Sequence, residues 1–378
     1  NFRLEKMRAV LAHRGNDARG RFLKKHIGLS HSRLAIRDIL CGDQPMTRTH
    51  NGYDYTICYN GEIYNTDELI PELSENGFVC STTSDTEVIL YAYIHWGADF
   101  VSRLNGIFAF AIWDAAKNRL LLYRDRVGVK PLFYAIRGDS LVFGSEPKAC
   151  FAHPAVRPEL DKQGLQELLA IGPAHTSGLS LFKDLFEVLP GHFMIYTRDG
   201  LHDETYWELT SHEHTESYRD TVAHTRFLVE DAIKRQMVSD VPVCTFLSGG
   251  IDSSIVTAIA ANYMNTRGKT LNTFSFDFKD NDRYFKANSF QPERDLPYVN
   301  RMLEEYETAH SYLECDENSL FKALFAAVDA KDMPGMTDVD SSLLYFCSLV
   351  SRKNKVALTG ECADEIFGGY PWFYRKEL

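Results

Sequence analysis

The sequence lacks any hydrophobic run that approaches the roughly 18 apolar residues of a membrane-spanning helix. It also lacks a surplus of positive charge, because 41 Lys and Arg stand against 52 Asp and Glu and give a net charge of −11. This balance disfavours a nucleic-acid backbone as a partner. No CxxC pair occurs among the eight scattered cysteines, which favours reduced thiols over disulfides. We therefore expect a cytoplasmic protein without membrane or nucleic-acid partners.

The length of the chain and a change in its pattern of predicted strands and helices indicate two domains. Over residues 1–208, short aromatic or β-branched runs such as YDYTICYNG and GIFAFAIWD surround one clear helical stretch, SDTEVILYAYIHWG. We expect an α+β domain of stacked antiparallel sheets flanked by helices. A polar linker at about 209–217 follows. Within residues 209–378, predicted strands alternate with predicted helices, which indicates an α/β domain with a parallel sheet.

The stretch FLSGGIDSSIV, Phe246–Val256, lies between a predicted strand and a predicted helix. Gly249 and Gly250 let backbone N–H groups approach an anion, toward which the helix directs its positive end. Ser248 and Ser253 add hydroxyl donors. The loop lacks the Lys of GxxxxGK[ST], so bound pyrophosphate fits it better than γ-phosphoryl transfer. Asp252 beside phosphate indicates a bridging Mg²⁺; an ordinary tight turn with an N-cap is the alternative.

A second acidic segment, KVALTGECADEIFGGYPWF, follows another predicted buried strand near the end of the sequence. Glu361, Asp364 and Glu365 are spaced so that a helical turn would place them on one face. At the end of a parallel strand, such a face lies beside the ligand crevice. One carboxylate could bind Mg²⁺ and another could take a proton from an attacking amine. The alternative is a solvated acidic turn.

These two segments resemble known motifs. SGGIDSS is similar to the pyrophosphate loop of the ATP-pyrophosphatase superfamily, and TGECADEIFGGY resembles SGEGADEIFGGY of the asparagine synthetases, with Thr359 and Cys362 in place of Ser and Gly. The resemblance implies ATP and Mg²⁺ as cofactors and aspartate, activated as β-aspartyl-AMP, as substrate. It implies Glu361 as the base that deprotonates ammonia. It places Mg²⁺ on Asp252 and Asp364, and ATP or pyrophosphate on Leu247, Ser248, Gly249, Gly250, Asp252, Ser253, Phe276, Thr359 and Gly360.

The first half resembles the class II glutamine amidotransferase domain of the same family, which has an Ntn-hydrolase-like fold. The segments LAHRGNDARG, HSRLAI, YNGEIYN, TSDTEV, RDRVGVKPLFY and FGSEPKA occur in family order. The resemblance implies glutamine as the ammonia donor. Arg33 can hold its α-carboxylate, Asp85 and Glu62 can receive its ammonium, and Asn60 with the N–H of Gly61 can stabilise the oxyanion.

Two expected parts are not in the sequence. The family nucleophile is an N-terminal Cys, whereas this sequence begins with Asn1, inside the segment that follows that Cys. We therefore expect no glutaminase activity from the chain as given, and the family's synthetase domain continues beyond Leu378. The segment Asp332–Phe346 falls where the family places aspartate-site residues, but it departs from the family pattern and receives no role. The family often forms dimers, so the resemblance is compatible with a homodimer, but the sequence does not fix the oligomeric state.

The leading hypothesis is therefore a glutamine-hydrolysing asparagine synthetase. One alternative is another amidotransferase or a β-lactam synthetase on the same framework. The other is a nucleotide- or glutamine-binding protein without turnover.

Sequencing the source gene separates the first two hypotheses. We expect a Cys codon directly after the initiator Met, because Arg33, Asn60 and Asp85 remain intact. Any other residue there favours the β-lactam synthetase, whose first domain is inactive and lacks this Cys.

Overall fold

The structure is a computed structural model that describes residues 2–287 and 293–376. The chain divides into two compact units. The first comprises Asn1–Glu213 and Val328–Met336, and the second comprises His214–Ala327 and Thr337–Leu378. Within the described ranges, no helix combines the length and apolar character needed to cross a membrane.

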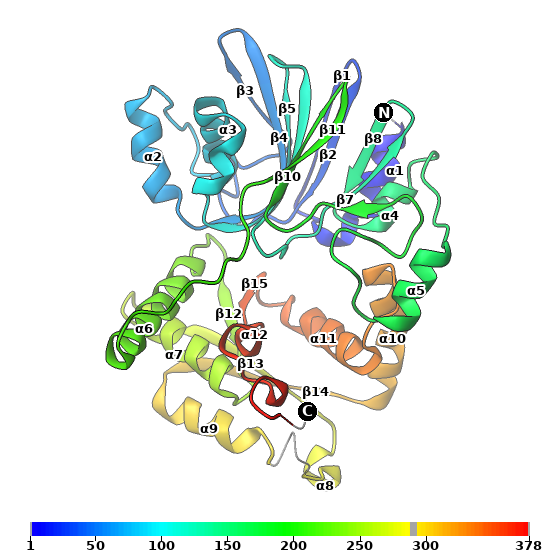
Figure 1. Ribbon diagram of the computed structural model, residues 1–378. Helices are drawn as coiled ribbons and strands as arrows, with labels where there is room; N and C mark the ends of the chain where they lie inside the picture. The colour runs from blue at the N-terminus through cyan, green and yellow to red at the C-terminus, as the bar shows by residue number, and fades with distance from the viewer. Residues whose placement is uncertain (1, 288–292, 377–378) are drawn as a thin grey trace. The chain divides into compact units, whose positions relative to one another are not determined.

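The first unit is built on a six-stranded antiparallel sheet in the order β11-β10-β6-β5-β4-β3 (Figure 1). Its strands are β3 (Met46–His50), β4 (Tyr53–Ile63), β5 (Gly106–Asp114), β6 (Arg119–Arg124), β10 (His192–Thr197) and β11 (Gly200–Thr205). Two smaller antiparallel sheets accompany it: β1 (Ala18–Lys24) with β2 (Ile27–Arg33), and β8 (Ser140–Gly144), β7 (Phe133–Arg137) and β9 (Phe186–Glu187). The prediction of stacked antiparallel sheets is confirmed.

Strand β5 shows why this unit forms layers. Its residues alternate between two hydrophobic cores, because successive side chains on a strand point to opposite faces. Phe108, Phe110 and Ile112 pack in the core that holds α3 (Asp85–Trp96), whereas Ala109, Ala111 and Trp113 pack with Ile27 and Leu29 of β2. The sheet is thus buried on both faces at its centre.

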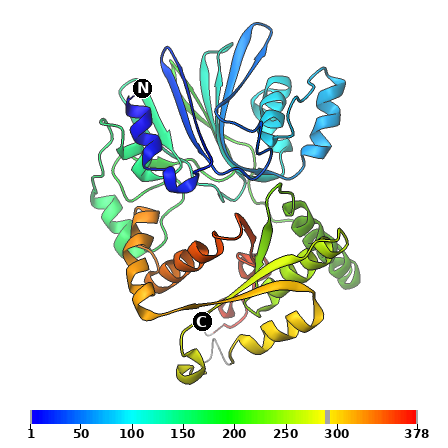
Figure 2. The ribbon, with the colours of Figure 1, turned by 180° about the vertical axis from the view of Figure 1, so that it is seen from behind.

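Helices cover one face of the six-stranded sheet. α3 packs on β4, and α2 (Thr66–Glu75) packs on α3, which Figures 1 and 2 show from opposite sides. Ser84 caps α3, because its hydroxyl accepts the N–H of Thr86 at 3.3 Å. The remaining helices of this unit are α1 (Phe2–Ala9), η1 (Ala12–Arg14), η2 (Ala98–Arg103), α4 (Pro147–Phe151) and α5 (Lys162–Ala170).

The second unit is an α/β layer structure with a four-stranded parallel sheet in the order β14-β13-β12-β15. Its strands are β12 (Val243–Phe246), β13 (Leu271–Phe278), β14 (Thr308–Cys315) and β15 (Val356–Leu358). Its helices are α6 (Tyr218–Gln236), α7 (Ile251–Asn265), α8 (Asn281–Tyr284), α9 (Leu296–Glu305), α10 (Glu317–Lys331), α11 (Thr337–Val350), α12 (Ala363–Phe367) and η3 (Pro371–Phe373). The predicted alternation of strands and helices, with a parallel sheet, is confirmed.

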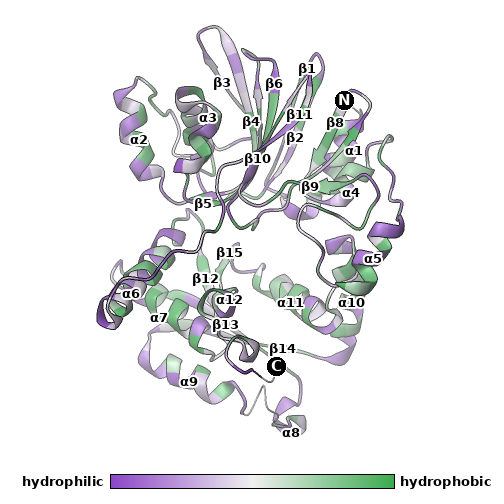
Figure 3. Ribbon diagram, viewed as in Figure 1, coloured by the Kyte–Doolittle hydropathy of each residue, from purple (hydrophilic) through white to green (hydrophobic). Residues whose placement is uncertain are grey.

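Helices lie on both faces of the parallel sheet. Val243 of β12 packs with Ala260 and Ala261 of α7, whereas the next residue, Cys244, packs with Phe346 and Val350 of α11. Figure 3 shows both hydrophilic and hydrophobic residues along α6, of which only Ile233 is buried. The sheet therefore forms the centre of the unit.

The segment Val328–Met336 belongs to the first unit although the second unit surrounds it in sequence. The backbone N–H of Lys148 donates to Asp332 Oδ2 at 2.9 Å, and Lys148 Nζ donates to the Ala330 carbonyl at 3.2 Å. The stretch Asp332–Phe346 is thus divided between the two units. Its first residues lie in the first unit, and the residues of α11 lie in the second.

Glu87 joins α3 to the loop that precedes it. Its carboxylate accepts hydrogen bonds from the backbone N–H and the hydroxyl of both Ser81 and Thr82, and from Arg48 Nε at 2.8 Å. Burial raises the pKa of Glu87, but these hydrogen bonds outweigh burial and lower the pKa to about 2 from its ordinary value of 4.5. The ionised carboxylate therefore stabilises the folded state.

Replacing Glu87 by Gln should lower the free energy of unfolding at pH 7 by about 1–3 kcal/mol, because Gln leaves buried donors unpaired. Since the folded pKa lies below the unfolded value, the stabilisation is complete above pH 4.5 and is lost as the pH falls toward 2. Urea unfolding between pH 7 and pH 3 should show the two proteins converging. The exposed Glu75→Gln serves as control, and parallel pH profiles for wild type and Glu87→Gln would contradict the assignment.

Candidate active site

The loop Leu247–Gly250, which we call the phosphate loop, connects β12 to α7. The helix begins at Ile251, so Asp252 and Ser253 lie in its first turn. Gly250 is the N-cap and supplies no side chain. The hydroxyls of Ser248 and Ser253 lie 2.9 Å apart, and Ser253 Oγ donates to the Gly250 carbonyl at 3.1 Å. The first turn of α7 thus presents backbone N–H groups to an incoming anion.

The second loop lies directly against the first. β12 and β15 are parallel neighbours with Thr245 opposite Leu358, so the loops that follow them leave the same edge of the sheet. A Cβ on Gly360 would lie 2.7 Å from Asp252 Cβ and 2.8 Å from the backbone nitrogen of Ser253. Only glycine permits this approach, and it brings the TGECADE segment onto the phosphate loop.

Asp252 and Asp364 come together across this contact. Burial raises the pKa of Asp252, and the negative charge of Asp364 raises it further. Within residues 2–287 and 293–376, no group of three or more His, Cys, Asp or Glu forms a ready metal site. Two carboxylates, completed by phosphate oxygens, nonetheless match the ligand set that Mg²⁺ takes in nucleotide sites.

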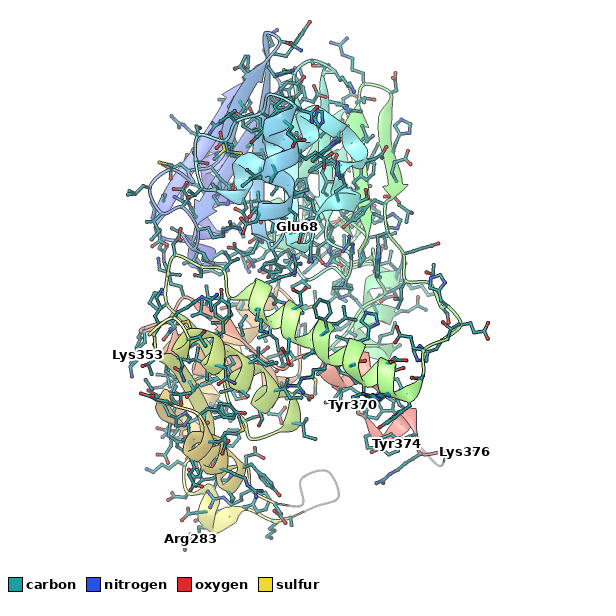
Figure 4. The ribbon with its side chains drawn as sticks, turned by 90° about the vertical axis from the view of Figure 1, so that its left-hand side faces the viewer. Glu68, Arg283, Lys353, Tyr370, Tyr374 and Lys376 are labelled. Carbon is teal, nitrogen blue, oxygen red and sulfur yellow. The ribbon has the colours of Figure 1, made fainter. Side chains whose placement is uncertain are left out.

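The expected single helical turn through Glu361, Asp364 and Glu365 does not form. Cys362 adopts a left-handed conformation with φ 69°, and α12 begins only at Ala363, so Glu361 precedes the helix and is exposed. Glu365 Oε1 accepts the hydroxyl of Tyr370 at 2.9 Å; Tyr370 is labelled in Figure 4. Carboxylate spacing alone could not reveal the left-handed residue that separates Glu361 from the other two.

A small cavity of about 170 Å³ lies beside the phosphate loop. Leu247, Ser248 and Phe276, which the sequence assigned to nucleotide contacts, line it. Two further residues, Asp277 and Tyr312, also line the cavity, and no motif or spacing pattern predicted them. Asp277 accepts the Tyr312 hydroxyl at 3.2 Å and the Asn281 amide at 2.6 Å, so the end of β13 carries an ordered polar cluster.

The first unit contains a much larger cavity of about 1410 Å³. All five residues that the sequence assigned to glutamine line it: Arg33, Asn60, Gly61, Glu62 and Asp85. They come from β2, β4 and the first turn of α3, which are separate segments of the chain. The fold therefore brings the expected set together.

Asn60 and Gly61 lie on β4 beside β5. A Cβ on Gly61 would lie 2.1 Å from the carbonyl oxygen of Ile107, so glycine is required where the two strands approach. Asn60 Nδ2 is buried and has no hydrogen-bond partner among the described residues. A buried amide donor without a partner is costly unless a ligand accepts from it.

The guanidinium of Arg33 already makes several hydrogen bonds within the protein. It donates to the carbonyls of Arg37, Asp38 and Ile39 and to Asp43 Oδ1 at 3.1 Å, and the Arg33 side chain is 7% exposed. Asp43 is 76% exposed, so it is the partner that a ligand carboxylate could replace.

Asp85 is buried beneath the cavity and its carboxylate is held by neighbours. Asp85 Oδ2 accepts the Tyr59 hydroxyl at 2.8 Å and the Ile63 N–H at 3.0 Å, and burial raises the pKa of Asp85. Arg37, which the sequence did not single out, lies 3.9 Å from the same oxygen. Gln44, also missed, accepts the Tyr59 N–H at 2.6 Å. Neither residue belongs to a spacing pattern that sequence reasoning could use.

Comparison with known proteins gives matches for both halves. Residues 1–207 match the glutamine amidotransferase domain family, and residues 224–378 match the asparagine synthase family. The chain is 49% identical to glutamine-hydrolyzing asparagine synthetase 3 of Bacillus subtilis over 99% of this chain and 61% of that protein. It is 33% identical to asparagine synthetase 1 of the same species, over 99% and 56%. It is 32% identical to a putative asparagine synthetase 2 of Methanocaldococcus jannaschii, over 97% and 72%.

The chain thus spans 61% and 56% of the two Bacillus relatives. Among solved structures, a glutamine phosphoribosylpyrophosphate amidotransferase of B. subtilis covers 92% of this chain and 84% of its own length. Its identity of 16% and TM-score of 0.38 are too low to support an inference.

Replacing Gly360 by Ala should separate the two loops, because the new methyl group has no room beside Asp252. We expect the affinity for pyrophosphate, measured by calorimetry, to fall by about tenfold or more, since a shift of about 1 Å is enough to disable a positioned site. The control is Gly268→Ala, where φ is +66° but no atom lies within 4 Å. That variant should lose about 1–2 kcal/mol of stability and keep its affinity. Equal affinities for the two variants would contradict the proposed packing.

Proposed function

We propose that this chain, which belongs to the glutamine-hydrolysing asparagine synthetase family, carries a glutamine site and an adenylating site of an enzyme that makes asparagine. The substrates are aspartate, ATP and glutamine. The observation that carries the proposal is the contact of Gly360 with Asp252 and Ser253. It joins a phosphate loop and an acidic loop, more than a hundred residues apart, at one edge of a parallel sheet, where α/β proteins bind their ligands.

The second unit would activate aspartate. A β-carboxylate oxygen of aspartate attacks the α-phosphorus of ATP, the bond to the β-phosphate breaks, and pyrophosphate leaves with its electron pair. The N–H groups of Gly249, Gly250 and the first turn of α7 would hold that pyrophosphate, and Ser248 and Ser253 would add hydroxyl donors. The loop has no Lys, so backbone dipoles and hydroxyls, and no cation of the loop itself, would make this binding.

Asp252 and Asp364 would hold Mg²⁺ together with phosphate oxygens, and the ion, when bound, neutralises charge on the triphosphate. Burial and then the negative charge of Asp364 raise the pKa of Asp252, and the second effect supports this assignment, because a divalent cation relieves the repulsion between the two carboxylates. Leu247 and Phe276 would face the adenosine from the small cavity at the end of β13.

Ammonia would then attack the acyl carbon of β-aspartyl-AMP, and the bond to AMP breaks. The attacking nitrogen becomes cationic and must lose a proton. Glu361 would take it, because it is exposed in the loop that contacts the phosphate-loop helix and is not engaged with Tyr370 as Glu365 is.

The first unit would bind glutamine for ammonia release. Asp85 and Glu62 would receive its α-ammonium, and Arg33 would take its α-carboxylate in place of Asp43. Asn60 Nδ2 and the Gly61 N–H would stabilise the oxyanion of the tetrahedral intermediate, and the unpartnered state of Asn60 Nδ2 supports that role. The family's cysteine nucleophile is not among the residues of this sequence, so hydrolysis itself is assigned to the full-length protein.

Pyrophosphate release by the full-length protein tests the proposal. With ATP, Mg²⁺ and ammonia, release should depend on added aspartate. Asp364→Asn should lower the rate by about 100-fold, since metal-ion stabilisation of transition-state charge is worth several kcal/mol. The exposed Glu304→Gln on α9 is the matched control and should keep the rate. Release that ignores aspartate would reject the substrate, and no release at all would favour a binding protein without turnover.

A further inference from the structure

His31 faces the glutamine cavity without a role in the proposed reaction. It lies on β2, two residues before Arg33, so the two side chains point to the same face of the strand. Both residues line the large cavity, as does Asn60 on β4. His31 Nδ1 and Asn60 Nδ2 are both buried, and neither has a hydrogen-bond partner among the described residues. One atom of each side chain is therefore left for a ligand.

The contacts of the ring fix which nitrogen carries the proton. His31 Nε2 lies 3.0 Å from the carbonyl oxygen of Tyr59. A carbonyl oxygen only accepts, so Nε2 is protonated and donates. Burial lowers the pKa of His31 to about 4, with a further lowering from Arg33, against the raising effect of the Tyr59 carbonyl. The ring is neutral at physiological pH, and Nδ1 is an acceptor with a bare lone pair.

The same contact places the ring close to Asn60. The Tyr59 carbonyl belongs to the peptide bond that leads into Asn60, so the imidazole is held at the backbone of the predicted oxyanion residue. Tyr59 directs its side chain toward Asp85, and because side chains alternate along a strand, Asn60 points to the other face. Cys58, on Asn60's side, contacts the Ser30 carbonyl of β2 at 3.5 Å, so β2 covers this face.

We propose that His31 Nδ1 accepts a hydrogen bond from the side-chain carboxamide N–H of bound glutamine, while Asn60 Nδ2 donates to the carboxamide oxygen. The inference rests on the proposed glutamine site. A carboxamide offers one acceptor and one donor, and this pair of buried groups matches it. The carboxylate of glutamate offers two acceptors, so one of its oxygens would face the lone pair of Nδ1 without a hydrogen. His31 is thus a specificity-determining residue that selects glutamine against glutamate.

Calorimetric titration of the chain with L-glutamine and with L-glutamate tests this proposal. Wild type should bind glutamine more tightly. His31→Leu should reduce the ratio of the two affinities by about tenfold, because the acceptor is lost. His31→Asn, whose amide oxygen can occupy the position of Nδ1, should keep the ratio within about threefold. Rescue by Asn separates recognition from a merely structural role.

A spectroscopic readout on wild type covers the case in which a variant does not fold. With ¹⁵N-labelled histidine, the bare Nδ1 signal of His31 should move on addition of glutamine and stay in place on addition of glutamate. Binding of glutamine without any movement of this signal, or an unchanged affinity ratio in a folded His31→Leu, overturns the inference and leaves the proposed glutamine site standing. Binding of neither ligand by wild type overturns both.

Discussion

The parallel pairing of β12 with β15 is the constraint on which the synthetase half depends. Because of this pairing, the loops that follow the two strands begin at the same edge of the sheet. The close contact at Gly360 then brings the backbones of the two loops together. Everything else at the site follows from this contact. Asp364 reaches Asp252 only because of it, and the exposed Glu361 stands beside the phosphate loop only because the two strands are neighbours.

The large cavity of the first unit depends on a different arrangement, in which one strand is shared by two cores. Because β5 packs α3 on one face and β2 on the other, β4 is held between a helix and a second sheet. Tyr59 and Asn60, adjacent in sequence, therefore serve opposite sides: Tyr59 orders the buried Asp85, and Asn60 enters the cavity. The carbonyl between them holds His31. The peptide unit between Tyr59 and Asn60 thus connects the residue that orders Asp85 with Asn60 and His31, which would contact the ligand.

Much of the fold and of both candidate sites could be predicted from the sequence, because these features depend on local sequence patterns. Hydrophobic periodicity predicted the helix that is α3, and the strand–loop–helix context marked Gly249 and Gly250. What the sequence could not reveal was backbone conformation and unpatterned partners. The left-handed Cys362 delays α12 and removes Glu361 from it. Gln44, Arg37 and Asp277 contribute through tertiary contacts that no spacing rule reports.

The placement of Val328–Met336 in the first unit has a consequence for how the chain is made. The backbone passes between the units three times, after Glu213, after Ala327 and after Met336. During synthesis, the first unit therefore remains incomplete until the ribosome has translated His214–Ala327 of the second. Lys148, translated early together with its partner Glu146, has to wait for Asp332 before it gains its second carboxylate partner. The two units are covalently interlaced and mature together, so neither is a module that could be separated by cutting one linker.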